Sequence, residues 1–145
     1  MRRAIVVALG TGAFISSAAA LSLGGTEESP GMTRGEYELK LRRVEAARPA
    51  ALARCEALPA ADKELCRTGA QANEMVRVAE IEQAYRRTRE SARALQRARI
   101  DARYQVDRAR CGALAGFRRD KCLVQAHATR GRAMLEAARP YETRF

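Results

Sequence analysis

Four cysteines stand in two pairs, and both pairs have the same spacing. Cys55 and Cys66 are separated by ten residues, as are Cys111 and Cys122, and the chain has no other cysteine. The flanking sequence also repeats, because the letters ARCEAL around the first pair recur as ARCGAL around the second, 56 residues later. A repeated cysteine pair predicts a repeated, cross-linked unit, and this limits the fold, the compartment and the chemistry of the chain.

The first residues have the pattern of a secretory signal peptide. Arg2 and Arg3 precede an uncharged, mostly apolar stretch that contains Ala18-Ala19-Ala20, an A-x-A cleavage site. We predict a signal peptide over 1–20, cleaved after Ala20, and a periplasmic or secreted location without a stable transmembrane segment. An uncleaved anchor is the alternative, because about 20 apolar residues can span a bilayer. In the oxidising compartment that export implies, four cysteines predict two disulfides.

The composition after the signal peptide favours helix. Residues 21–32 include Gly24, Gly25 and Pro30 and are predicted to be a flexible tether. The remainder, 33–145, is rich in Ala, Arg, Glu and Leu and has no tryptophan, which predicts an all-α domain.

Helix ends are marked at both sides of this domain. Thr33 and Glu36 have the spacing of a capping box, so a first helix is expected from about 34 to 57, with a kink near Ala46 caused by Pro49. A last helix is expected from about 118 to 139.

The middle of the chain offers two architectures. Between the two expected turns, residues 63–111 contain one glycine and no proline, and apolar or small residues recur at three-four spacing. One long central helix would then join the hairpins into an extended rod. If residues 86–91 bend instead, the hairpins would pack as a four-helix bundle. The sequence favours the rod, because no strong helix breaker stands at the centre.

Each expected turn lies inside a cysteine pair. Four cysteines allow three connectivities, and the repeat favours Cys55–Cys66 with Cys111–Cys122 over the crossed pairings. The predicted fold is therefore two disulfide-tied αα-hairpins, 33–88 and 89–145. Closing each short loop is expected to stabilise the fold by about 3 kcal/mol.

The cysteine hairpins resemble those of uncharacterised exported (periplasmic) helical proteins of proteobacteria, which carry duplicated motifs of the form C-x-x-L-x-G-N-x-K-D-x-C-x-x-x-A. The second copy carries Cys111, Leu114, Gly116, Asp120, Cys122 and Ala126 in these places. The first copy carries Cys55, Leu58, Lys63, Cys66 and Ala70. Ala61 and Phe117 stand where the family has asparagine, and the proline-containing break common between the hairpins is absent. The resemblance implies helical hairpins and an exported location, and it brings no established activity.

Basic charge is concentrated in the second half of the chain. From 83 to 145 there are sixteen basic and six acidic residues, against nine and eleven from 21 to 82. An arginine run of this kind is a candidate site for an anionic envelope component, because the guanidinium fork binds phosphate in a bidentate way. The export signal argues against nucleic acid as the partner. The candidate anion-binding residues are Arg86, Arg87, Arg89, Arg93, Arg97, Arg103, Arg108 and Arg110.

Catalytic and metal-binding patterns are not found in the sequence. The single histidine, His127, is expected to be a solvated helix position, since a Cys/His metal site needs closer ligands and free thiolates. The cysteine spacing differs from the C-x-x-C of thiol oxidoreductases. We expect no cofactor and no enzymatic activity. The predicted function is an envelope structural or interaction protein that self-associates through its helices, with polyanion binding as the alternative and thiol-redox or metal chemistry as a weaker one.

Overall fold

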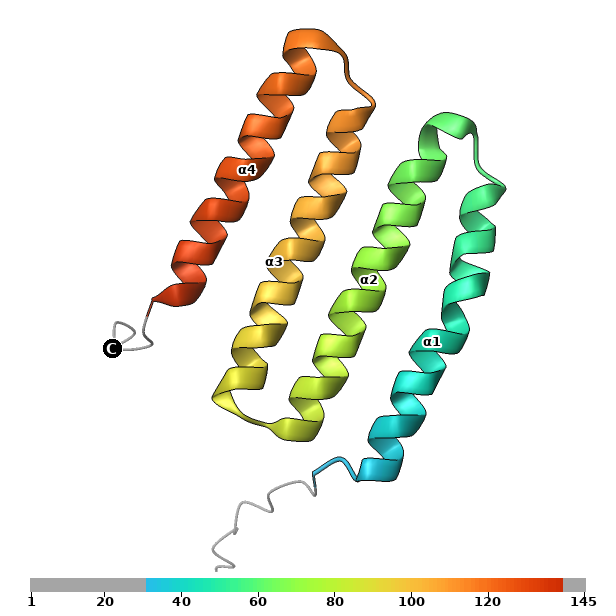
Figure 1. Cartoon of the computed structure of the whole chain (residues 1–145), viewed down its shortest axis with the longest axis vertical. Coiled ribbons are helices and arrows are strands. Elements are labelled where there is room, and N and C mark those ends of the chain that lie inside the picture. The colour runs from blue at the N-terminus through green and yellow to red at the C-terminus, as the bar shows by residue number, and fades with distance from the viewer. Residues whose placement is uncertain (1–30, 140–145) are drawn as a thin grey trace, which may run out of the picture.

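The computed structural model of the chain describes residues 31–139, which form four α-helices and no strand (Figure 1). The predicted signal peptide and most of the predicted tether lie outside these residues. The all-α fold of helical hairpins is confirmed. The helices are α1 (Arg34–Glu56), α2 (Ala60–Arg86), α3 (Arg89–Gly112) and α4 (Gly116–Ala138).

The capping box predicted at the start of α1 is confirmed. The Thr33 hydroxyl accepts a hydrogen bond from the Glu36 backbone N–H at 3.2 Å, and the Glu36 carboxylate accepts one from the Thr33 backbone N–H at 2.8 Å. Two backbone donors that the first turn leaves without a helical partner are satisfied in this way. The helix then continues through Pro49 to Glu56.

The preference for one unbroken central helix was wrong. The helix α2 ends at Arg86, and Arg87 adopts a left-handed conformation with φ of 50°, its N–H donating to the Gln83 carbonyl at 2.9 Å. Thr88 then caps α3 in a second capping box with Ser91. A left-handed arginine costs about 1–2 kcal/mol. The reversal is stabilised by the cap and by the junction that it creates between α2 and α3.

The four helices lie side by side in a single layer. Among the described residues, Cα atoms of different helices approach within 8 Å only between chain neighbours: α1 with α2, α2 with α3, and α3 with α4. Figure 1 shows the two disulfide-tied turns at one end of the layer and the α2–α3 turn at the other. The centre of the chain therefore bends, as a bundle requires, but α1 and α4 stay apart as the two edges of an open layer.

The interior of this layer consists of small side chains. A helix in a single layer is covered only on the sides that face its neighbours, so large side chains stay partly exposed, while small ones allow helices to approach closely. The buried residues of the described chain are Cys55, Ala72, Ser91, Ala102, Cys111 and Ala126.

Candidate functional site

Both predicted disulfides are present. Cys55 pairs with Cys66 and Cys111 with Cys122, with Cα–Cα distances of 5.4 and 5.6 Å. The side chains of Cys55 and Cys111 are 1% and 0% exposed. One sulfur of each bridge is therefore shielded from an attacking thiolate, which is the property of a structural cross-link rather than of a reactive disulfide.

Ion pairs distinguish the two disulfide ends. Next to the first bridge, the Glu56 carboxylate binds Arg67 at 2.6 Å and Lys63 at 3.5 Å, and hydrogen bonding from Arg67 lowers the Glu56 pKa. The repeat places Gly112 at the position of Glu56 in the second copy, and Arg119 at that of Lys63. The end of the layer at the Cys111–Cys122 bridge therefore has a basic residue, Arg119, but no acidic residue at the position of Glu56.

The candidate anion-binding arginines do not form one surface. Arg86 ends α2 and Arg87 lies in the turn, while the other six lie on α3. Helical spacing places Arg103 and Arg110 about two turns apart on one face of α3, where both line the groove between α2 and α3. Arg93, Arg97 and Arg108 follow a second line, about a third of a turn away, towards α4. The arginines of α3 therefore reach both faces of the layer.

Several of these arginines already have acidic or aromatic partners. Asp107 accepts from Arg110 at 3.1 Å and lies 3.8 Å from Arg103. Arg108 lies over the Tyr104 ring, 5.7 Å from its centroid. Within the described chain, no acidic partner is found for three exposed members of the set, which are Arg89, Arg93 and Arg97. These three are the best placed to bind an external anion.

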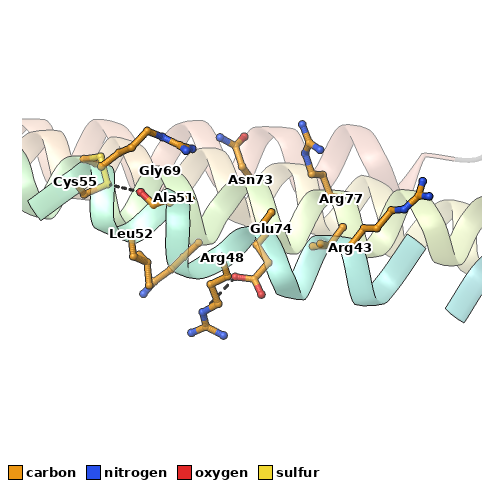
Figure 2. Close-up of a pocket in the computed structure, with 15 residues that line it drawn as sticks. Arg43, Arg48, Ala51, Leu52, Cys55, Gly69, Asn73, Glu74 and Arg77 are labelled. Carbon is orange, nitrogen blue, oxygen red and sulfur yellow. Dashed lines mark hydrogen bonds and ion pairs between the residues drawn. A yellow bond between two sulfur atoms is a disulfide. The ribbon is translucent and has the colours of Figure 1, made fainter. Parts of the chain in front are cut away.

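A groove that the sequence did not predict lies between α1 and α2 (Figure 2). It has a volume of about 630 Å³ and a floor that includes Val44, Ala51 and Leu52. Arg48 and Glu74 form an ion pair across it at 3.6 Å. The other arginines that line it have no acidic partner in the described part of the chain, and they are Arg43, Arg54 and Arg77. The groove arises where alanine and glycine of the two helices face each other, and a linear sequence does not disclose this.

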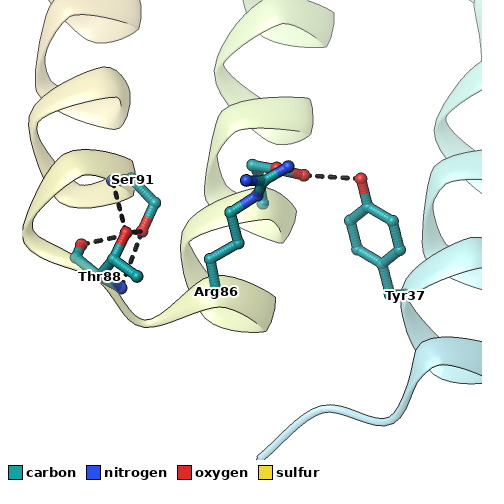
Figure 3. Close-up of polar contacts among 5 residues, drawn as sticks. Tyr37, Arg86, Thr88 and Ser91 are labelled. Atoms are coloured by element: carbon teal, nitrogen blue, oxygen red, sulfur yellow. Dashed lines mark hydrogen bonds and ion pairs between the residues drawn. The ribbon is translucent and has the colours of Figure 1, made fainter.

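A polar cluster joins α1 to the end of α2 (Figure 3). The Tyr37 hydroxyl donates to the Glu82 carboxylate at 2.6 Å, and Arg86 forms an ion pair with the same carboxylate. The Tyr37 ring stacks on Tyr85 with centroids 4.4 Å apart. The hydrogen bond between Tyr37 and Glu82 raises the tyrosine pKa and, with the help of Arg86, lowers the glutamate pKa. Sequence reasoning missed this contact, because the two partners are 45 residues apart.

The substitution Tyr37→Phe should lower stability in a window of pH. The lowered Glu82 pKa stabilises the fold above that group's ordinary value of 4.5, and the raised Tyr37 pKa does so below the ordinary value of 10.0. The substitution should therefore lower the urea midpoint most between pH 4.5 and pH 10.0, and the loss should become smaller below the first value and above the second. An equal loss at every pH would contradict this assignment. Tyr85→Phe, which keeps the ring stack, is the control.

The single histidine contacts a tyrosine. The Tyr104 hydroxyl lies 2.9 Å from His127 Nε2, and Arg130 of α4 lies over the same tyrosine ring, 5.0 Å from its centroid. Arg130 also binds Asp101 of α3 at 2.7 Å. His127 is exposed, as expected, but it helps to fix α4 on α3. In residues 31–139 no three His, Cys, Asp or Glu side chains lie close enough together to hold a metal ion.

Comparisons with known proteins identify no relative. The chain matches no protein-family model, and neither a curated protein nor a solved structure is detectably similar to it. No helix within 31–139 is long and apolar enough to cross a membrane. The resemblance to exported proteobacterial hairpin proteins therefore stays a prediction.

Proposed function

We propose that this chain is an exported, non-enzymatic interaction protein of the cell envelope, and that the α3–α4 hairpin binds anionic surfaces. The signal-peptide pattern at 1–20 and the family resemblance support export. Two structural disulfides in a small helical layer are typical of an oxidising compartment.

The divergence of the two hairpins in charge carries this proposal. The helices α3 and α4 contain twelve basic and five acidic residues, whereas α1 and α2 contain ten and nine. At six positions where the first hairpin has an acidic residue, the second has a neutral or basic one. With the residue of the first copy named before its equivalent in the second, the six pairs are Glu36/Ala92, Glu38/Ala94, Glu56/Gly112, Asp62/Arg118, Glu74/Arg130 and Glu82/Ala138.

The loss of internal acidic partners leaves basic side chains of the second hairpin available for an external anion. A cluster of arginines without internal counter-charges attracts polyanions over a distance set by ionic strength. Lipid phosphates at a membrane surface are such partners, and each basic side chain near an anionic surface contributes about 1 kcal/mol to binding. The thiol-redox alternative is less well supported, because one sulfur of each bridge is buried.

Binding to lipid vesicles tests this function. The purified protein should co-sediment with vesicles of phosphatidylglycerol and phosphatidylcholine in equal parts at low salt, and be released as salt rises. The double variant Arg93→Gln/Arg97→Gln should weaken binding roughly thirtyfold, since two surface charges contribute about 2 kcal/mol. Vesicles of phosphatidylcholine alone should not bind the protein.

A matched variant separates a local site from net charge. Arg54→Gln/Arg77→Gln removes the same charge from two exposed arginines of the first hairpin that also have no acidic partner in the described chain. It should change binding by a few-fold at most. Equal losses for the two double variants would show that only net charge matters, and an absence of binding at low salt would exclude the function.

A further inference from the structure

The outer face of α4 is exposed and, apart from Lys121, apolar or small. Phe117, Val124 and Leu135 are 80%, 68% and 69% exposed. They lie at helical spacing on the side opposite Ala126, the buried α4 residue that faces α3. We call this surface the α4 edge, and its apolar and small residues are Phe117, Val124, Ala128, Gly131 and Leu135.

The outer face of α1 is the opposite edge of the layer. Its residues are small or apolar apart from one arginine, and all are exposed. Leu39, the largest apolar side chain among them, is 42% exposed. We call this surface the α1 edge, and its residues are Gly35, Leu39, Arg42, Ala46, Ala50 and Ala53.

The 56-residue repeat relates these free edges to a junction that already exists in the molecule. When 56 is added to their residue numbers, the residues of the α1 edge correspond to a face of α3 that packs on α2. The residues of this face are Ser91, Leu95, Ala98, Ala102, Val106 and Ala109. When 56 is subtracted from their residue numbers, the four α4-edge residues that follow Phe117 correspond to residues of α2 on the side that faces α3. These are Thr68, Ala72, Met75 and Ala79. Every residue of these two internal faces is buried or half-buried, whereas every edge residue is exposed.

An ion pair of the internal junction has unpaired equivalents beside the two edges. Arg99 of α3 binds Glu80 of α2 at 2.8 Å and joins the two hairpins. The repeat equivalents are Arg43 on α1 and Glu136 on α4, so both charges recur with the same signs. Within the described residues neither Arg43 nor Glu136 has an ion-pair partner. The charges beside the two edges are thus complementary, as those of the internal junction are.

We propose that the α4 edge of one copy packs antiparallel against the α1 edge of a second copy, as α2 packs against α3. In repeat architectures each unit contacts its neighbours, and terminal units need a polar outer face to remain single. Here each terminal face is small or apolar apart from one basic residue, and the two faces correspond through the repeat to the two sides of an existing junction. The contact is heterologous, so it continues from copy to copy into a chain or ring. It does not depend on the proposed binding of anionic surfaces.

Two edge-blocked variants test this assembly. Ala46→Glu places a charge on the α1 edge, and Ala128→Glu does so on the α4 edge; both positions are exposed, so circular dichroism should remain unchanged. In sedimentation at about 0.5 M salt, where surface charges are screened, the mass of the unmodified protein should rise with concentration. Each variant alone should stay monomeric, and their equimolar mixture should form a dimer and nothing larger.

Other outcomes would overturn the proposal. If Ala46→Glu alone still associates, α4 pairs with α4 by two-fold symmetry instead. If the mixture of the two variants stays monomeric, the edges do not bind each other. The same conclusion follows if the unmodified protein is monomeric up to about 1 mM, because even an interface with a binding free energy of about 4 kcal/mol would be populated at that concentration.

A charge exchange tests the predicted ion pair. Arg43→Glu or Glu136→Arg alone should weaken association about tenfold, because like charges then face each other. The double variant R43E/E136R should restore it. Glu45→Arg changes the net charge as Glu136→Arg does, but its repeat equivalent, Asp101, faces α4 rather than α2. Glu45→Arg should leave association unchanged, and no restoration in the double variant would disprove the pair.

Discussion

Removing the Cys111–Cys122 disulfide by the double substitution Cys111→Ala/Cys122→Ala should lower the free energy of unfolding by about 3 kcal/mol. The bridge closes a short loop, with a sequence separation of 11, and so restricts the unfolded chain. The layer has little else to compensate, because its buried residues are almost all alanine or cysteine. Urea unfolding followed by far-UV circular dichroism measures this loss.

The first disulfide provides the matched control. The Cys55–Cys66 bridge has the same sequence separation, so the chain-entropy contribution is equal and Cys55→Ala/Cys66→Ala should cost a similar amount. With both bridges removed, the expected loss of about 6 kcal/mol approaches the whole stability of a small domain, and the protein should be largely unfolded. A loss below about 1 kcal/mol for either pair would show that the bridges add little to the helical layer.

Ala102→Leu should destabilise the protein by about 3 kcal/mol, the upper end of the range for overpacked interiors. Ala102 is 6% exposed at the junction of α2 and α3, where it lines a shallow groove with Ala72 and Val106. A leucine there would push the two helices apart along the most extensive junction of the layer. The same urea titration gives the loss in free energy of unfolding.

The repeat supplies an exposed equivalent for comparison. Ala46 on α1 corresponds to Ala102 and is exposed, so Ala46→Leu should change the unfolding free energy of dilute protein by less than about 0.5 kcal/mol. Similar costs for both substitutions would mean that helix propensity, and not the α2–α3 junction, determines the result.

Most of the fold could be predicted from local sequence. The capping residue Thr33, the helix-forming composition and the two cysteine pairs were sufficient for helical hairpins and their cross-links. The break at Arg87–Thr88 falls in the stretch 86–91, where a bend was the less favoured alternative because no residue there is a strong helix breaker. Its signal was a second capping box, in which Ser91 takes the place usually held by glutamate or glutamine. A left-handed arginine becomes favourable only when α2 and α3 can pack, and that is a tertiary effect.

The candidate site was harder to predict than the fold. Sequence reasoning identified the arginine run, but helical periodicity distributes it over two sides of α3, and partners such as Asp107 occupy some of its members. The contacts of Tyr37 with Glu82 and of Tyr104 with His127 link different helices and have no local signal. The repeat offset was more informative than charge alone, because it relates exposed positions to buried ones in the same chain.

The small-residue interior also determines how stability varies with temperature. The heat capacity of unfolding grows with the apolar surface that becomes exposed to water, at about 0.45 cal/K/mol per Å². An interior of alanine and cystine, with large side chains already half in solvent, exposes little additional apolar surface on unfolding. The stability curve should therefore be shallow, so that the folded layer gains or loses little free energy between cold and warm surroundings.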